Sequence, residues 1–327
     1  MEFPFIRPGT TNPPAQPRDI PVPDRAKQED PAGYLTDGPL VDAMNVALLL
    51  GSPLLLTGEA GTGKTQLAAR LAWELGFGAP IEFNTKSTTT ARDLFYTFDA
   101  MQRFHAAHTG DGSASNLDYL TYNALGTAIL QSLPRDAVAH LLPPGFRHTG
   151  PRRSVVLIDE VDKAPRDFPN DLLREVENMS FRIPELRNEE VKASREMRPV
   201  LVLTSNSEKN LPDAFLRRCV FYHIPFPEKP RLVSIVESRL GAFADGSSAL
   251  LDSALDFFLE VRTRLTRKPP STAELINWLQ SLKAHGFSGS QNILDNPTAL
   301  RASLTALAKT KDDSEELERL VKAKLGG

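Results

Sequence analysis

Apolar residues along the chain repeat with two different spacings, and the two kinds of segment alternate. Residues 40–50 and 67–75 carry apolar side chains every three or four positions, which predicts amphipathic helices. Continuous apolar runs, typical of strands buried on both faces of a parallel sheet, lie between helical segments. These runs are residues 53–56, 154–158, 200–203 and 220–224, and one further strand is predicted at residues 81–84. The alternation predicts a β-α-β series that closes a parallel sheet.

Four segments in the middle of the chain depart from this simple pattern. Residues 100–107 predict a helix, and the Gly/Ser-rich residues 109–116 predict a surface loop. Residues 118–129 fit neither the helical nor the strand period well, and a hairpin is one interpretation. Residues 134–153 resemble a loop-like insertion with a short helix.

The two ends of the chain differ from the middle. Residues 1–32 hold eight prolines and almost no apolar periodicity, which predicts an extended or disordered arm that either wraps a neighbouring subunit or forms a flexible tail. From residue 228 to about 324 the pattern is helical, and the breaks in it are at residues 241–247, 269–270 and 286–297. We therefore expect an arm at 1–32, an αβα domain at 33–226 and a small helical domain at 227–327.

Composition is that of an ordinary globular protein. Charged residues make up 24% of the chain and hydrophobic ones 41%, and the net charge of −3 gives no reason to expect non-specific binding to nucleic acid or to a membrane. Cys219 is the one cysteine, so no intrachain disulfide can form, which suits a reducing compartment. No apolar run approaches the ~20 residues of a membrane span, and the N-terminus does not resemble a signal peptide. We expect a cytoplasmic protein.

The first candidate for chemistry is a glycine-rich loop that follows the apolar run at residues 53–56 and precedes the helix at 67–75. It matches the pattern G-x-x-x-x-G-K-[ST], in which backbone N–H groups surround phosphate oxygens. A helix N-terminus after the loop adds a favourable dipole for an anion. Lys64 is expected to reach the β- and γ-phosphates, and the Thr65 hydroxyl is expected to hold Mg²⁺. The expected phosphate-binding residues are Gly58, Glu59, Ala60, Gly61, Thr62, Gly63, Lys64 and Thr65.

Two acids end the apolar run at residues 154–158. The carboxyl end of a strand faces the ligand crevice of an open α/β sheet, so Asp159 is expected to hold Mg²⁺ directly or through water. Glu160 is expected to orient or deprotonate an attacking water. The alternative is that both acids cap the next helix.

Two more candidates follow the next predicted strands. Asn206 ends the strand at 200–203, where it is expected to hydrogen-bond the attacking water or the γ-phosphate; alternatively it is a turn residue. Arg217 and Arg218 end a short predicted helix, and arginine suits the charge on a transferring phosphoryl group. Because the pair is not expected to reach its own phosphate loop, it would act on a neighbouring subunit. The alternative is a salt-bridged helix C-terminus.

Taken together, these motifs resemble an AAA+ ATPase, and most closely its MoxR-type branch. The resemblance spans about residues 33–310, and the MoxR assignment rests on residues 94–100, 167–173 and 214–219, with residues 33–47 similar to the entry of that branch. It implies an αβα domain, a helical lid and a ring, usually of six subunits. It also implies that Arg218 is the arginine finger, assisted by Arg217, and that Asn206 is the first sensor.

The resemblance implies a function as well. We expect Mg²⁺-dependent ATP hydrolysis in a homo-oligomeric ring that remodels or matures a partner complex, as a chaperone would. The partner often carries a von Willebrand factor A domain, whereas a membrane partner is not expected. A hairpin at residues 179–197 would lie near the ring's centre, and residues 116–127 would form the family's other inserted hairpin. The alternatives are an AAA+ motor or loader that acts on nucleic acid, and a nucleotide-gated scaffold.

Two details complete the sequence-based picture. The family often has an arginine at the start of a lid helix, but residues 268–274 hold none. Lys268, Arg267 or Arg264 would have to replace it, and Ser271 or Thr272 is expected to cap the following helix. His105 and His108 lie three apart on a predicted helix with no third ligand evident, so we expect no metal there.

Overall fold

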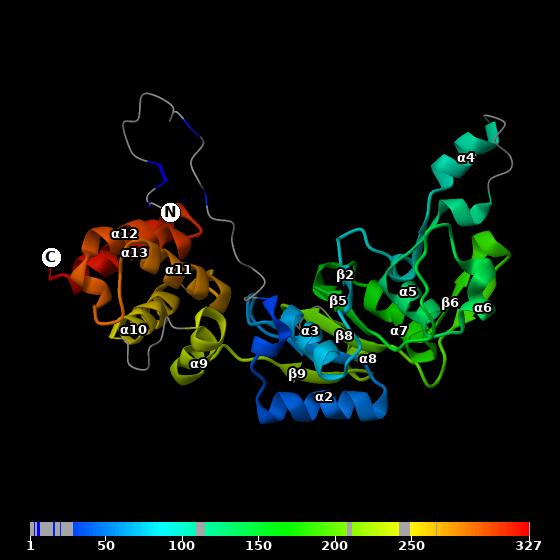
Figure 1. Cartoon of the computed structure of the whole chain (residues 1–327), viewed down its shortest axis with the longest axis horizontal. Coiled ribbons are helices and arrows are strands. Elements are labelled where there is room, and N and C mark those ends of the chain that lie inside the picture. The colour runs from blue at the N-terminus through cyan, green and yellow to red at the C-terminus, as the bar shows by residue number, and fades with distance from the viewer. Residues whose placement is uncertain are drawn as a thin grey trace. The chain divides into compact units, whose positions relative to one another are not determined.

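The structure is a computed structural model of the 327-residue chain. It describes residues 29–108, 115–207, 211–241, 249–265 and 267–326, together with Phe3, Phe5, Ile6, Gln16 and Ile20. Most of the predicted arm, residues 109–114 of the predicted loop, and nearly all of the predicted break at 241–247 lie outside the described residues. The chain divides into two compact units (Figure 1), one of Thr36–Glu59 and Gly63–Pro225 and the other of Met1–Leu35, Ala60–Thr62 and Phe226–Gly327.

A five-stranded sheet forms the centre of the first unit. Its strand order is β2-β5-β8-β1-β9, and every neighbouring pair is parallel. This topology confirms the predicted P-loop type of α/β fold, followed by helices in the C-terminal region. The strands are β1 (Leu54–Thr57), β2 (Ile81–Asn84), β5 (Val155–Asp159), β8 (Val200–Ser205) and β9 (Val220–His223).

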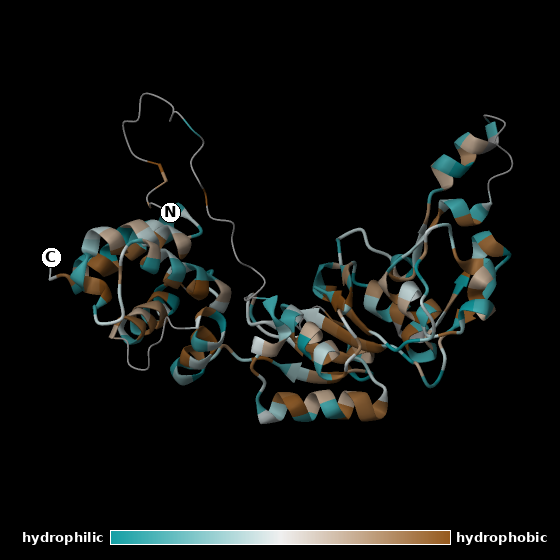
Figure 2. Ribbon diagram, viewed as in Figure 1, coloured by the Kyte–Doolittle hydropathy of each residue, from teal (hydrophilic) through white to brown (hydrophobic). Residues whose placement is uncertain are grey.

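The central strands are apolar because they are covered on both faces. Every side chain of β1 and β8 is buried, whereas β9 at the sheet's edge alternates between half-buried and exposed positions. The difference follows from the number of neighbours, since an edge strand has one partner and a central strand two. In Figure 2 the central strands are accordingly brown, and the apolar C-terminal end of α2 is brown as well.

Helices cover the sheet. α3 (Lys64–Glu74) packs on β5 and β8, α5 (Ala124–Gln131) packs on β2 and β5, and α2 (Gly38–Leu50) packs on β9 and β1. Asp37 caps α2 by accepting a 2.9 Å hydrogen bond from the backbone N–H of Leu40. The remaining helices of this unit are α4 (Ala100–His108), α6 (Arg135–Val138), α7 (Phe168–Asn178) and α8 (Asp213–Leu216), with 3₁₀ turns η2 (Ala91–Leu94), η3 (Asn116–Tyr119), η4 (Ala139–Leu141) and η5 (Val161–Lys163).

The hairpin predicted at residues 118–129, or at residues 116–127 by the resemblance, was wrong. These residues begin in η3, continue as the short strand β4 (Leu120–Tyr122) and then enter α5. β4 pairs antiparallel with β3 (Tyr96–Phe98), which lies before α4. Leu125, Ala128 and Ile129 recur at helical spacing and are fully buried, so packing against the sheet selects a helix there.

The other predicted hairpin is confirmed. β6 (Ser180–Ile183) and β7 (Glu189–Lys192) pair antiparallel, with the 3₁₀ turn η6 (Pro184–Leu186) between them. The chain reverses at Arg187 and Asn188, whose φ angles are 59° and 60°. Asparagine adopts this left-handed conformation more readily than most residues.

The second unit is helical. After the 3₁₀ turn η1 (Pro31–Gly33), its elements are α9 (Lys229–Leu240), α10 (Ala249–Arg264), α11 (Thr272–Ala284), α12 (Pro297–Ser303) and α13 (Lys311–Lys324), with 3₁₀ turns η8 (Ile293–Asp295) and η9 (Leu304–Ala306). Its core includes the fully buried Trp278, whose indole N–H donates a 2.9 Å hydrogen bond to Ser303 Oγ.

The breaks between these helices are partly as predicted. Those at residues 269–270 and 286–297 are present, and a further one lies between α12 and α13, where Thr310 and Asp313 form a capping box that starts α13. Among the described residues, no helix has the length and apolar character needed to cross a membrane.

Candidate functional site

The glycine-rich loop connects β1 to α3 and has the backbone that phosphate binding needs. Gly58, Gly61 and Gly63 have φ angles of 145°, 76° and 90°, a range that side chains with a Cβ rarely tolerate. Gly63 is also the N-cap of α3 and brings no side-chain acceptor. The first N–H groups of α3 are therefore not capped by that residue, and a helix N-terminus of this kind suits an anion.

Lys64 is the most constrained side chain of the loop. It is 7% exposed, and its ammonium donates hydrogen bonds of 2.8 Å to the carbonyl oxygens of Gly58 and Glu59. A third hydrogen bond, of 3.0 Å, goes to Asn206 Oδ1. Burial lowers the pKa of Lys64 from its usual value, although the nearby carboxylates of Asp159 and Asp162 act in the opposite direction. A ligand carrying negative charge at this position would compensate for that burial.

Thr65 and Asp159 meet beside the loop. The Thr65 hydroxyl donates to Asp159 Oδ2 at 3.1 Å. A hydroxyl and a carboxylate next to a phosphate-binding loop suit Mg²⁺, which prefers oxygen ligands and takes its others from phosphates and water. These donors fit the predicted metal, although no group of three or more His, Cys, Asp or Glu side chains in the described part of the chain could hold a metal by itself.

Glu160 follows Asp159 in an unusual backbone conformation. Its φ and ψ are 58° and 50°, a left-handed conformation that costs about 1–3 kcal/mol for a residue other than glycine. Its carboxylate forms an ion pair with Lys163 in η5, so the predicted base is held by a cation. The alternative, in which Glu160 caps the next helix, is not its arrangement here, because Glu160 precedes η5 without a side-chain cap hydrogen bond.

Asn206 lies where its position after β8 predicts. Its side chain contacts Lys64, and its backbone N–H donates a 3.1 Å hydrogen bond to Asp162 Oδ1. The sheet order explains the placement, because β8 lies between β5 and β1. The carboxyl ends of these three parallel strands bring Asp159, Asn206 and the phosphate loop to one edge.

Arg217 and Arg218 follow α8 and are exposed. Arg218 forms an ion pair with Glu177 of α7, and its guanidinium also donates to the carbonyl of Ala214 at 3.1 Å. Within the described part of the chain, the contacts of Arg218 thus lie on α7 and α8 rather than on the phosphate loop. The helix-terminus ion pair considered as the alternative is present, and the action on a neighbouring subunit stays a prediction.

A family model for the AAA domain of the dynein-related subfamily matches residues 53–219. The chain belongs to this AAA family. The matched stretch begins just before β1 and ends just before β9, so it contains the phosphate loop, Asp159, Glu160, Asn206 and Arg218. No curated protein matched the chain in a search. The AAA+ part of the resemblance is thereby confirmed, whereas the MoxR-type branch stays a prediction.

Within this AAA domain, Thr204 is a site residue that the sequence analysis missed. It is fully buried in β8. Its hydroxyl donates to Asp159 Oδ1 and accepts a 2.9 Å hydrogen bond from the backbone N–H of Glu160. A polar residue two positions before Asn206 in an apolar strand was the available signal. Lys163 and Asp162 were missed as well, because charged residues after a strand are common on solvated turns.

The helical unit of this AAA protein shows how the candidate replacements for the lid arginine are placed. Arg264 forms ion pairs with Glu260 and Glu316, so it is held by carboxylates of its own unit. Arg267 and Lys268 are exposed. Ser271 is confirmed as the N-cap of α11, because its hydroxyl accepts a hydrogen bond from the backbone N–H of Glu274 in the first turn of that helix.

Proposed function

We propose that the chain binds ATP with Mg²⁺ at the loop between β1 and α3 and hydrolyses the γ-phosphate. The observation that carries this proposal is the Lys64–Asn206 hydrogen bond beside the Thr65–Asp159 pair. These two contacts place a phosphate-binding cation, a side chain suited to orient water and two oxygen ligands for a metal next to one another. The bound Mg²⁺ would neutralise part of the phosphate charge.

The residues of the chain divide this work among them. Lys64 and the loop N–H groups hold the phosphates, and Thr65 and Asp159 hold the metal. Glu160 accepts the proton of the attacking water or orients that water, which requires its carboxylate to leave Lys163. Asn206 positions the same water or the γ-phosphate.

We further propose that the active form is a homo-oligomeric ring, a hexamer by resemblance, in which Arg218 acts on the nucleotide of the neighbouring subunit and Arg217 assists. The exposure of both arginines supports this arrangement. So do the exposed apolar residues Leu49 and Leu50 at the end of α2, which are 85% and 65% exposed. Exposed apolar surface of this kind is typical of protein contacts.

For the cellular role we propose remodelling or maturation of a partner protein complex, in the manner of MoxR-type chaperones, with a client that carries a von Willebrand factor A domain. The exposed, oppositely charged Arg182 and Glu190 of the β6–β7 hairpin support a protein contact, and the net charge of −3 favours a protein client over nucleic acid. A cytoplasmic location is part of the same proposal.

The decisive experiment is the ATPase rate per subunit, measured with Mg²⁺ against protein concentration. We expect a cooperative rise, because the site is completed by a neighbour. Glu160→Gln is expected to retain ATP binding and to lose turnover. If wild-type protein binds ATP but does not hydrolyse it at any concentration, the chain is a nucleotide-gated scaffold. If DNA or RNA stimulates the rate in a salt-dependent manner, it is a nucleic-acid motor.

A further inference from the structure

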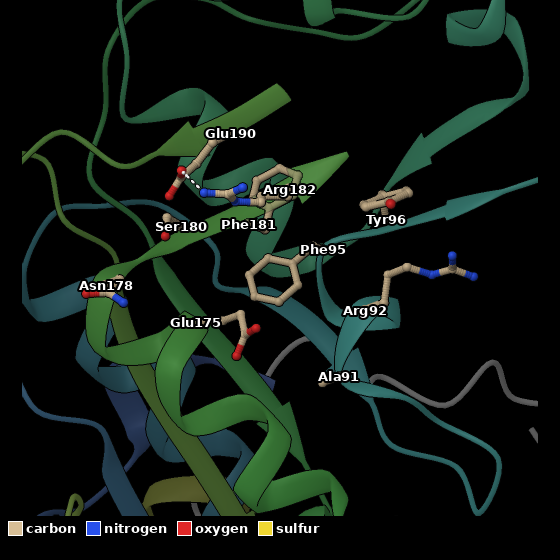
Figure 3. A pocket seen from close by; sticks show the side chains of 10 residues that line it. All are labelled: Ala91, Arg92, Phe95, Tyr96, Glu175, Asn178, Ser180, Phe181, Arg182 and Glu190. Carbon is tan, nitrogen blue, oxygen red and sulfur yellow. Dashed lines mark hydrogen bonds and ion pairs between the residues drawn. The ribbon is translucent and has the colours of Figure 1, made fainter. Parts of the chain in front are cut away.

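A cavity of about 550 Å³ lies within the sheet-containing unit, between η2, the C-terminal end of α7 and the β6–β7 hairpin (Figure 3). Its volume is within the range of ligand-binding pockets. The side chains that matter for its chemistry are Arg92, Phe95, Glu175, Phe181, Arg182 and Glu190.

The inner wall of the cavity is aromatic and rigid. Phe95 and Phe181 stack with ring centroids 5.0 Å apart and an interplanar angle of 19°. Tyr96 lies beside Phe181, with a centroid distance of 6.2 Å. All three side chains belong to the buried core of the unit. The wall is therefore a preformed apolar surface, suited to methylene groups or to a flat cation.

Glu175 is the side chain that has no partner in this cavity. Its Oε2 is buried and has no hydrogen-bond partner among the described residues. In Figure 3 its carboxylate extends from α7 towards the space beside the Phe95 ring. A buried polar atom without a partner costs about 1–3 kcal/mol of free energy. A ligand that supplies a hydrogen-bond donor to this carboxylate would lower that cost.

The other charges of the cavity are already paired. Arg182 forms an ion pair of 2.9 Å with Glu190. Arg92 forms one of 3.6 Å with Glu185, whose carboxylate also accepts a 2.9 Å hydrogen bond from the Tyr96 hydroxyl. The charge left over is the negative charge of Glu175, and the complementary ligand is a cation.

We propose that this cavity binds a lysine or arginine side chain of a partner polypeptide. Its ammonium or guanidinium group would form an ion pair with the Glu175 carboxylate, and its methylene groups would lie against Phe95 and Phe181. The cavity is larger than one side chain, and Asn178 and Ser180 on the same wall supply polar groups for the adjoining peptide backbone. The site goes beyond the proposed ATPase activity and does not depend on it.

The test compares three nine-residue Gly/Ser peptides that carry a fluorophore and differ at the central residue, which is lysine, arginine or norleucine. Norleucine retains the apolar stem and lacks the charge. Binding is measured by fluorescence anisotropy on the full-length wild-type chain, on Glu175→Gln and on Asp171→Asn, which removes an exposed carboxylate from the same helix. Tm is measured for each variant.

We expect the lysine and arginine peptides to bind the wild type at least tenfold more tightly than the norleucine peptide. Glu175→Gln should abolish that preference and Asp171→Asn should retain it. The Tm of Glu175→Gln should stay equal or rise, because the change removes the charge of a carboxylate whose Oε2 is buried without a partner. Equal affinity for all peptides, a preference that survives in Glu175→Gln, or a lowered Tm of that variant would each overturn the proposal. Agmatine or cadaverine binding as tightly as the peptides would overturn the assignment to a polypeptide.

Discussion

Lys64 Nζ lies 3.0 Å from Asn206 Oδ1, although the two residues are 142 positions apart in the chain. The contact exists because β8, which precedes Asn206, is the direct neighbour of β1, which precedes the phosphate loop. The pairing of these two strands thus brings the lysine of the loop and the residue after β8 into direct contact.

Replacing Asn206 by alanine removes the group that we expect to orient the attacking water. The turnover rate of ATP should fall by about 10²-fold or more, while the affinity for ATP should change little. Steady-state kinetics and equilibrium binding of ATP check both expectations. Asn170→Ala, at an exposed position of α7, is the control and should behave as the wild type. A large loss of affinity with unchanged turnover would contradict the assigned role.

Thr204→Val keeps the shape of a buried side chain but removes its hydroxyl. The backbone N–H of Glu160 then loses its partner, and Asp159 loses one donor. The free energy of unfolding should decrease by about 1–3 kcal/mol, and turnover should fall because both acids lose their support. Chemical denaturation and ATPase kinetics measure these effects. Thr204→Ser retains the hydroxyl and should keep most of the activity, and equal losses in the two variants would indicate a packing effect instead.

Arg218→Ala tests catalysis across subunits. An arginine finger contributes about 10³–10⁵ in rate in GTPase systems, so turnover should collapse while ATP binding persists. The fold should be little affected, because Arg218 and Glu177 are half exposed and such an ion pair contributes about 0–1 kcal/mol. Arg319→Ala, which removes another exposed, ion-paired arginine, is the control.

Mixing Arg218→Ala with Glu160→Gln sharpens this test. In a mixed ring, some sites combine an intact Glu160 from one subunit with an intact Arg218 from the next. ATPase activity should therefore exceed that of either variant alone. If the mixture is as inactive as its components, Arg218 does not act in trans.

Cys219 gives a prediction for alkaline pH. Burial raises the pKa of its thiol to about 12, whereas the thiol of an unfolded chain has a pKa of about 8.5. Between these values the folded state binds more protons than the unfolded state, so this residue makes stability fall as pH rises from about 9 towards 12. Denaturation at a series of pH values, compared with Cys219→Ala, should show a steeper alkaline loss in the wild type. The folded thiol should also react slowly with maleimide at pH 8, and fast reaction would contradict the raised pKa.

Much of the fold followed from local pattern. The strands at 54–57, 81–84, 155–159, 200–205 and 220–223 and most helices agree with the periods of apolar residues, because burial on both faces requires unbroken apolar runs. Residues 118–129 were predicted wrongly because their pairing is not local. The strand in this segment, β4, is only three residues long. Its partner β3 precedes α4 in the chain, whereas β4 follows it, so no local pattern identifies the pairing.

Residues whose function depends on neighbours in the chain could be identified from local pattern alone. The phosphate loop is a contiguous backbone conformation that its glycines permit, and Asp159 and Glu160 are adjacent at the end of one strand. Three other relationships became visible only in the folded chain: Thr204 supports both acids, Glu177 holds Arg218, and Glu175 faces an aromatic wall without a partner. Each of these relationships depends on side chains from separate elements, or on the burial that those elements create. Packing of the whole unit, rather than spacing along the chain, sets which of them meet.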